Sequence, residues 1–440
     1  MSIAIKSETC VFRLLQMAIR LITLGELKMS IPEAKKYIKD FEQLGFGVFV
    51  HFGLYSILEK GEWSARLRTG LITKEDYYKL TKKFNPGNME NMVLQIKNSG
   101  AKYITLTTKH HDGFHLFDAC GNSEFDVMHS AAGRDLVKEF VTACRKHDIV
   151  PFFYYATMEW WHPDFDGNFD RYLEYLRNDV KLLCTNYGKI GGLWFDGNWS
   201  KKGEGDIWQE DKLYSLIRKY QPDAMIITNT GLSSTGSVGH PEIDSVTYER
   251  GNARPINRDG MDKYISGEVC DSINMHWGIA DDINYKSPMQ ILTSLVKSRS
   301  AGANYLFNVG PDSNGNIPQY PLATLNVIGK WINIFGNAVY NGRPYWYRED
   351  SSVFILKDDK HLYFFYINLA RKGSSDVTYI SGTEGMIKFN DIGVNVANIK
   401  WMDNNEQLDY SKDEDDLTVN FTGYDYGTDY CVRVAVGDIV

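Results

Sequence analysis

Between about residues 45 and 310, short apolar segments alternate with longer stretches of mixed polar and apolar residues. The apolar segments are 46–52, 103–108, 150–156, 192–197, 224–229, 244–250, 265–273 and 304–310. Continuous apolar runs joined by long connections are typical of parallel strands that are buried on both faces. Two of the connections, 133–148 and 287–302, carry apolar residues at helical spacing, and the second begins with Ser-Pro, a helix start signal.

This pattern predicts about eight strand–helix units over roughly 270 residues, which is the size of a (β/α)₈ barrel. A doubly wound open sheet is the alternative. It is less well supported, because no glycine fingerprint follows the first strand.

After about residue 345 the segments become shorter, and apolar and polar residues alternate between turn residues. They are 352–358, 361–369, 377–382, 386–391, 396–402, 417–423 and 430–439. Alternation with a period of two predicts an antiparallel β-sandwich of about 95 residues. We therefore expect a barrel over 31–345 and a sandwich over 346–440.

Residues 1–30 are expected to be an N-terminal extension. Its segment 11–29 has the spacing of an amphipathic helix, and Met29 is a second candidate start. A secretory signal is disfavoured, because Arg13 and Arg20 interrupt the apolar run and no small-residue cleavage site follows.

Charge and cysteine content narrow the function classes. With 48 basic and 56 acidic residues, the net charge of −8 argues against nucleic acid or an anionic membrane as the main partner. The six cysteines are scattered and form no CxxC pair, which favours buried thiols in a reducing compartment, and hence a cytoplasmic protein. The sequence has no run of 18 uncharged apolar residues, so no membrane-spanning helix is expected.

Polar residues stand at the ends of the predicted barrel strands, where catalytic groups of such barrels sit. In chain order they are His51, Lys109, His110, His111, Asp112, Tyr154, Tyr155, Asp196, Asn229, Glu249, Arg250 and Glu268. A single histidine is more often structural. Seven strand ends in register predict one shared cup-shaped site.

The residue types at these strand ends limit the chemistry. A metal site is disfavoured, because adjacent His110 and His111 would point to opposite sides of a strand and no HxH or HxxxH pair lies nearby. The sequence has no GxSxG segment, so acyl transfer has little support. Carboxylates, imidazoles and aromatic faces are the equipment of glycoside hydrolysis, and aromatic residues make up 13% of the chain.

Six sequence segments contain half of these residues. They are FGVFVHFGLYS (46–56), GEWSARL (61–67), KYITLTTKHHDGFHLFD (102–118), GGLWFDG (191–197), HWG (276–278) and GANYLFNVGPDSNGNI (302–317). In unbroken order over about residues 35–345, they resemble the α-L-fucosidases of glycoside hydrolase family 29. The resemblance implies a barrel followed by a β-sandwich, and a retaining exo-hydrolase of terminal α-L-fucose that uses no metal or other cofactor.

The resemblance also implies roles for single residues. Asp196 in the WFDG block matches the nucleophile. The expected substrate contacts are His51, Glu62, Trp63, His110, His111, Tyr155, Trp194 and Trp277. The histidines match positions that bond fucose hydroxyls, and the aromatic residues match walls and floor. Trp277 departs from the family's SWGY block, because the chain reads HWGIA.

The acid/base carboxylate has two candidates. Glu249 in TYERG is similar to an acidic-Arg segment just ahead of the family's WExC block, and it is favoured because that segment can reach the leaving-group side. Glu268 in GEVCDSIN is the second candidate, in a segment that lacks the Trp of WExC. We expect a double displacement on a fucosylated oligosaccharide or glycoconjugate, with self-association of the protein left open. A non-catalytic fucose-binding barrel and a metal-dependent barrel hydrolase are the alternatives.

Overall fold

The computed structural model describes residues 31–440, apart from 69, 202–206, 368, 374–377, 383–384 and 424–429. Residues Lys35–Ile256 and Ile265–Val440 form one compact unit. The predicted N-terminal helix lies outside the described residues.

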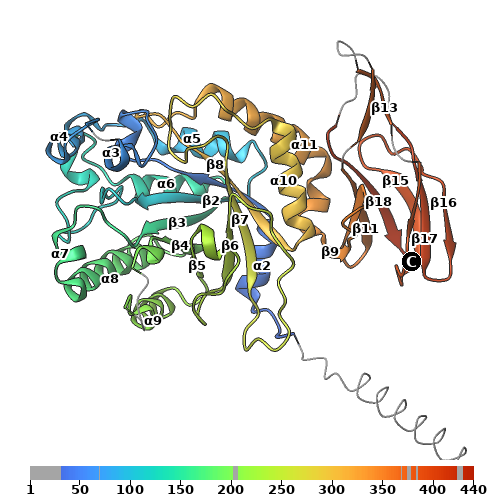
Figure 1. Cartoon of the computed structure of the whole chain (residues 1–440), viewed down its shortest axis with the longest axis horizontal. Helices are drawn as coiled ribbons and strands as arrows, with labels where there is room; N and C mark the ends of the chain where they lie inside the picture. Colours follow the sequence, from blue (N-terminus) through green and yellow to red (C-terminus); the bar gives the residue numbers. More distant parts are fainter. Residues whose placement is uncertain are drawn as a thin grey trace, which may run out of the picture. The chain divides into compact units, whose positions relative to one another are not determined.

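Eight parallel strands form a closed barrel, in which each strand pairs with the next and β8 pairs with β1 (Figure 1). The strands are β1 (Phe46–Val50), β2 (Tyr103–Lys109), β3 (Val150–Ala156), β4 (Gly192–Asp196), β5 (Met225–Thr228), β6 (Ser245–Glu249), β7 (Ser266–Ser272) and β8 (Ala303–Val309). All eight predicted segments are strands, so the predicted barrel is confirmed. Most of their side chains are buried, because one face meets the barrel interior and the other meets helices.

Helices follow β1, β2, β3, β4, β7 and β8 and cover the barrel (Figure 1). Over the described residues 229–265, only a short 3₁₀ turn lies between β5 and β6 and no helix lies between β6 and β7, so the prediction of eight strand–helix units is wrong for these two connections. The helices are α2 (Lys36–Leu44), α3 (Ser64–Leu67), α4 (Lys74–Lys79), α5 (Met89–Lys97), α6 (Leu136–Lys146), α7 (Pro163–Asp166), α8 (Phe169–Thr185), α9 (Glu210–Tyr220), α10 (Pro288–Ser300) and α11 (Gln319–Asn341). Short 3₁₀ turns are η1 (Leu54–Ile57), η2 (Leu80–Lys83), η3 (Val127–His129), η4 (Asn198–Ser200) and η5 (Leu232–Ser234). The predicted start of α10 is confirmed, since Ser287 forms a capping box with Gln290 and Pro288 takes the first helical position.

The C-terminal part consists of antiparallel sheets. The strands are β9 (Arg343–Trp346), β10 (Val353–Lys357), β11 (His361–Tyr366), β12 (Ala370–Gly373), β13 (Thr378–Gly382), β14 (Gly385–Phe389), β15 (Val396–Trp401), β16 (Tyr410–Asp413), β17 (Asp416–Phe421) and β18 (Arg433–Ile439). A five-stranded sheet in the order β15-β18-β11-β10-β9 and a three-stranded sheet β14-β17-β16 bury one apolar core, while β12 and β13 form a separate pair. The predicted sandwich is confirmed, with its first strand beginning at Arg343 instead of after residue 345.

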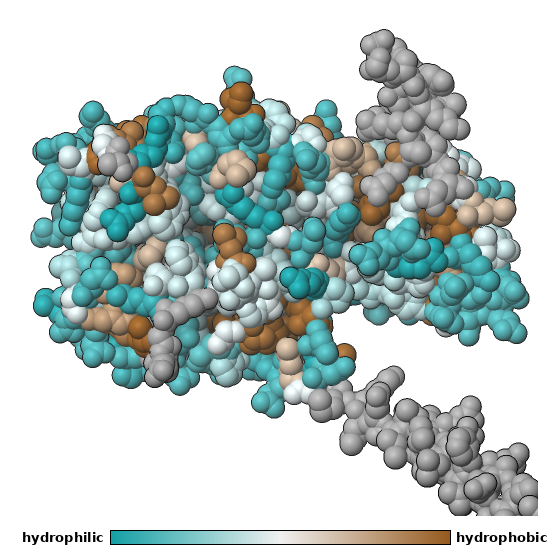
Figure 2. All heavy atoms as spheres, viewed as in Figure 1, coloured by the Kyte–Doolittle hydropathy of each residue, from teal (hydrophilic) through white to brown (hydrophobic). Residues whose placement is uncertain are grey.

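Hydrophilic residues cover most of the surface seen in Figure 2, and apolar residues form small patches between them. Over the residues that the structure describes, no helix combines the length and the apolar character needed to span a bilayer.

Candidate active site

A cavity of about 570 Å³ opens at the C-terminal ends of the barrel strands. Its lining residues are Phe49, His51, Trp63, His110, Tyr154, Trp194, Asp196, Trp199, Asn229, Gly231, Leu232, Ser233, Glu249, Cys270 and Trp277. Seven of the predicted site residues meet here, namely Asp196, Glu249, His51, His110, Trp63, Trp194 and Trp277. The predicted convergence of strand ends is therefore confirmed.

Asp196 ends β4 and accepts four hydrogen bonds. His111 Nε2 and the Tyr154 hydroxyl face Oδ2 at 3.2 and 3.0 Å, while Trp199 Nε1 and Asn229 Nδ2 donate to Oδ1 at 2.9 and 3.1 Å. Burial alone would raise the pKa of Asp196, but its hydrogen-bond donors outweigh burial and hold that pKa below its ordinary value. The carboxylate is thus ionised and fixed in orientation.

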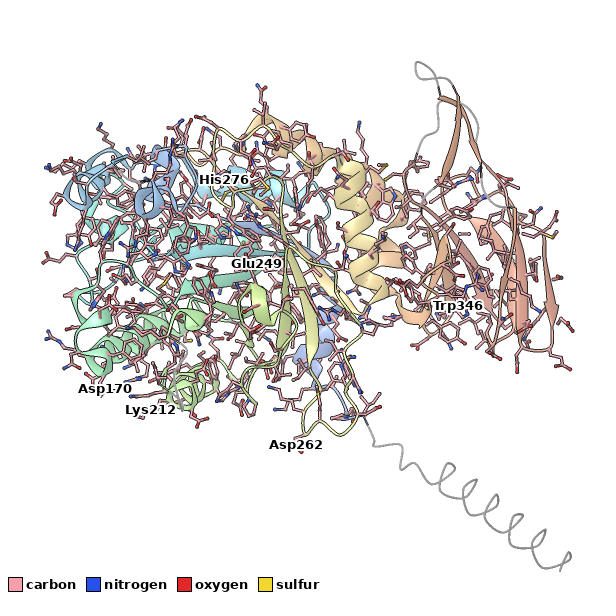
Figure 3. All side chains as sticks on the ribbon, viewed as in Figure 1. Asp170, Lys212, Glu249, Asp262, His276 and Trp346 are labelled. Carbon is pink, nitrogen blue, oxygen red and sulfur yellow. The ribbon has the colours of Figure 1, made fainter. Side chains whose placement is uncertain are left out.

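Glu249 ends β6, which is separated from β4 by β5, and is labelled among the barrel strands in Figure 3. Its Oε2 accepts a hydrogen bond from Asn229 Nδ2 at 2.9 Å, and the same amide donates to Asp196. Burial and the charge of Asp196 raise the pKa of Glu249. One amide therefore joins an ionised carboxylate to a carboxyl group that holds its proton to higher pH.

Glu268 does not reach the cavity. On β7 it shares the inward face with Cys270, which lines the cavity, but two residues along a strand place it roughly 7 Å deeper in the barrel. Its oxygens accept hydrogen bonds from Tyr103 and from the indole of Trp194, at 2.6 and 2.8 Å. Burial raises the pKa of Glu268 to about 7. Glu268 supports the cavity floor from below, so its candidacy as acid/base is wrong.

His51 and His110 line the cavity as neutral rings. Burial lowers the pKa of His51 to about 3 and that of His110 well below the ordinary value. The Nδ1 of His51 lies 2.6 Å from Asn308 Oδ1, and the Asn308 amide group donates to the carbonyl of Trp277. This orientation of Asn308 makes His51 Nδ1 the donor, which leaves Nε2 of His51 as an acceptor.

His110 and His111 both reach the site, with ring centroids 4.6 Å apart. The expectation that they point to opposite sides is wrong, because β2 ends at Lys109 and both histidines follow the strand. His111 is buried and lies behind the cavity lining, where Nε2 meets Asp196 and Nδ1 meets the Met158 carbonyl at 3.1 Å.

Glu62 and Trp63 have different positions. Trp63 lines the cavity and packs against His111 and Trp160, with ring centroids 5.1 and 4.9 Å apart. Glu62 is buried and accepts the backbone N–H groups of Trp277 and Gly278 at 3.0 and 2.8 Å. Glu62 thus holds the HWG segment instead of lining the cavity. Trp277 itself lines the cavity and stacks on His51.

Tyr155 lies outside the cavity, so its predicted place on the cavity floor is wrong. Successive strand residues point to opposite faces, and on β3 it is Tyr154 that faces the interior, where it stacks on Trp194 and bonds Asp196. The Tyr155 hydroxyl instead donates to Asp179 of α8 at 2.8 Å.

Sequence reasoning also missed the roles of Asn229, Trp199 and Asn308. Asn229 stands at a predicted strand end, which was a usable signal. Trp199 follows WFDG by two residues, and Asn308 belongs to β8, for which no site residue was predicted. Among the described residues, no group of three or more His, Cys, Asp or Glu side chains is arranged to hold a metal ion.

Comparison with known proteins gives a consistent picture. The α-L-fucosidase family matches residues 26–337. The chain is 25% identical over 367 residues to tissue α-L-fucosidase of Homo sapiens, a match that covers 76% of each chain.

Solved structures agree. α-L-Fucosidase isoenzyme 1 from Paenibacillus thiaminolyticus has a TM-score of 0.78 at 29% identity and covers 92% of this chain and 99% of its own. A family 29 α-L-fucosidase from Bacteroides thetaiotaomicron, trapped as a covalent intermediate, has a TM-score of 0.79 at 21% identity, with 93% and 98% covered. At that identity the second likeness concerns the fold.

Proposed function

The chain belongs to the α-L-fucosidase family of glycoside hydrolases, and from that premise we propose that it removes terminal α-L-fucose with retention of configuration. Asp196 is the proposed nucleophile and Glu249 the proposed acid/base. The Bacteroides relative was trapped as a covalent intermediate, and we propose an intermediate of the same kind here, formed on Asp196.

The observation that carries the proposal is the amide bridge between the two carboxyl groups. Asn229 Nδ2 lies 3.1 Å from Asp196 Oδ1 and 2.9 Å from Glu249 Oε2, so these two oxygens cannot lie farther apart than the sum of those distances, 6.0 Å. Retaining glycosidases hold their carboxyl groups about 5 to 5.5 Å apart, whereas inverting enzymes need about 6.5 to 9.5 Å for a water molecule. The bridge therefore supports a double displacement.

The two carboxyl groups have the protonation states that this chemistry needs. Asp196, with its pKa lowered, attacks the anomeric carbon as the carboxylate while the bond to the leaving oxygen breaks. Glu249, with its pKa raised by burial and by the charge of Asp196, gives its proton to that oxygen. Glu249 then takes a proton from water, whose oxygen attacks the anomeric carbon and releases Asp196.

The remaining cavity residues suit a small polyhydroxylated ligand. Neutral His51 presents an acceptor nitrogen, and His110 adds a second imidazole to the same wall. Trp63, Trp194 and Trp277 offer aromatic faces to the C–H surfaces of a sugar. We propose that these residues bind the fucosyl group, whereas Glu62 and Glu268 act by holding Trp277 and Trp194.

Proton NMR of the hydrolysis of an aryl α-L-fucoside tests this proposal. The first sugar to appear should be α-L-fucose, before mutarotation produces the β anomer. The matched aryl β-L-fucoside and α-D-galactoside serve as controls and should not turn over at a comparable rate. Initial appearance of β-L-fucose would contradict the double displacement, and absence of turnover in folded protein would favour a binding function.

We also propose a cytoplasmic location. In the described part of the chain Cys120, Cys144, Cys184 and Cys270 are free thiols, as a reducing compartment permits. Fractionation of cells that express the tagged protein tests this location, and recovery from the secreted fraction would contradict it.

A further inference from the structure

A buried ion pair lies outside the cavity lining, behind the nucleophile. Lys109 Nζ, at the end of β2, donates to Glu159 Oε2 at 2.7 Å, and the side chains are 0% and 8% exposed. The ammonium also faces the rings of Tyr155 and Tyr175, at 4.4 and 5.1 Å from their centroids. The Tyr175 hydroxyl donates to Glu159 at 3.1 Å.

Burying such an ion pair costs desolvation free energy that an apolar filling of the same space would avoid. Removing two charges from water costs several kcal/mol per ion, and apolar side chains of similar volume are often equally stabilising. Although burial opposes ionisation, the charge and hydrogen bond of Lys109, together with the charges of His115 and His162, outweigh it and lower the pKa of Glu159. The pair therefore keeps its charges, and its value must be sought in what it holds in place.

Glu159 lies between the two residues that hold His111. The Met158 carbonyl faces His111 Nδ1 at 3.1 Å, and the Trp160 backbone N–H donates to the His111 carbonyl at 2.9 Å. Nε2 of the same imidazole faces Asp196 at 3.2 Å. A displacement of Glu159 would therefore move its chain neighbours Met158 and Trp160, which hold His111. Movement of His111 would in turn alter its hydrogen bond to the nucleophile.

The start of this loop is held separately. Ala156 pairs with Asp196 in the sheet, and Thr157 donates from its backbone and its hydroxyl to the Asp196 carbonyl, at 2.7 and 2.9 Å. Because the sheet already fixes residue 157, the influence of Glu159 falls on residues 158–160 and on His111.

The segment that contains the histidines is shaped around Glu159. Gly113 has φ +82°, and a Cβ there would lie 2.4 Å from Glu159 Oε1. The run from Lys109 to Gly113 thus supplies the cation that pairs with Glu159 and the space for its carboxylate, and it carries His111 between them.

We propose that the Lys109–Glu159 ion pair is a positioning device, which fixes residues 158–160 so that His111 is held against Asp196. The proposal rests on Asp196 as the nucleophile. Lys109 and Glu159 act through His111 and make no contact with the cavity. Tyr154, Trp199 and Asn229 also bond Asp196, and Glu249 shares the Asn229 amide with it, so the ion pair modulates a nucleophile that other groups also hold.

Two variants test the device by the pH dependence of kcat/KM for an aryl α-L-fucoside. Glu159→Gln keeps the shape of the side chain, and Lys109→Met/Glu159→Leu removes both charges while filling the space. Displacing a catalytic group by about 1 Å can cost 10²-fold in rate, so we expect a loss of about 10- to 100-fold. The acid limb should move to higher pH, because a weaker His111 contact leaves the pKa of Asp196 less depressed.

The same substitutions in a His111→Ala background test whether the ion pair affects activity through His111. If Glu159 acts through His111, Glu159→Gln should reduce kcat/KM by no more than about twofold once His111 is gone. Asp403→Asn is the matched control, because it breaks the buried Asp403–Arg433 pair of the sandwich, 2.9 Å long. It should lower the unfolding temperature and leave the pH limbs unmoved.

The inference is overturned if folded Glu159 variants keep the wild-type acid limb, or if their loss multiplies fully with that of His111→Ala. Failure of the proposed function would appear separately, as activity that survives Asp196→Ala.

Discussion

The C-terminal end of the barrel, which we call the rim, and the core of the sandwich bury side chains of opposite character. The sandwich core consists of aliphatic and aromatic residues such as Val353, Ile355, Phe364 and Phe389, packed between two sheets. At the rim the buried residues include polar and charged ones, namely His110, His111, Asp112, Lys109 and Glu159. Burying charged groups opposes folding unless each one is bonded. The rim therefore marks where structure serves chemistry, and the sandwich where it serves packing.

The largest effect on activity is expected for a substitution at the barrel rim. Asp196→Ala removes the nucleophile, and loss of a group that acts as part of a unit costs on the order of 10³-fold or more in kcat. Stability should change little, because Asp196 borders a cavity and fills little packed volume. Steady-state kinetics and thermal unfolding of the purified variant check both statements. Near-wild-type turnover by folded protein would contradict the proposed role.

The reverse effect is expected in the sandwich. Phe364 is fully buried and packs against Phe389 and Phe421, with ring centroids 5.6 and 6.2 Å apart. Phe364→Ala should cost about 3 to 5 kcal/mol in free energy of unfolding by lost burial and cavity formation. Denaturant unfolding measures this loss, and kcat below the unfolding transition should equal that of wild type. A tenfold lower kcat would show that the sandwich shapes the active site.

The contrast explains what the sequence could predict. Apolar runs identify strands in both regions, so all eight barrel strands and the main sandwich strands were predictable. Positions within the rim depend on finer geometry. Whether Tyr154 or Tyr155 faces inward depends on strand register, and the depth of Glu268 relative to Glu249 depends on the stagger between β6 and β7. Neighbouring His110 and His111 reach one site because β2 ends before them. None of these can be read from residue types alone.

Glu268 is a buried carboxyl group with a structural role, in contrast to Glu249, so its titration should affect stability. Its pKa is about 7 in the folded protein and close to 4.5 when unfolded, so the unfolded state loses its proton first as pH rises. Folding stability should therefore fall between about pH 4.5 and 7, by up to about 3 kcal/mol, and level off above. Glu268→Gln removes this titration. Urea unfolding at several pH values compares the two proteins, and parallel stability profiles would contradict this account.

The smallest effects distinguish two adjacent tyrosines. Tyr154→Phe removes a donor to Asp196, which should lower kcat/KM about tenfold and move the acid limb to higher pH, since the pKa of Asp196 is less depressed. Tyr155→Phe removes the bond to Asp179 but keeps the ring over Lys109, so it should cost about 1.5 kcal/mol in stability. Its acid limb should stay in place. Equal pH profiles for the two variants would contradict the assigned orientations.

The central claim is that Asp196 and Glu249 act as nucleophile and acid/base across one cavity. Glu249→Ala removes the acid, which should slow a fucosyl-oligosaccharide far more than an activated aryl fucoside, because only the poor leaving group needs a proton. Azide needs no deprotonation and fits the vacated space. With an activated aryl fucoside, azide should restore turnover and give α-L-fucosyl azide, with Glu268→Gln as the control that azide does not rescue. Formation of the β-azide from Glu249→Ala would contradict the account, because it would make Glu249 the nucleophile.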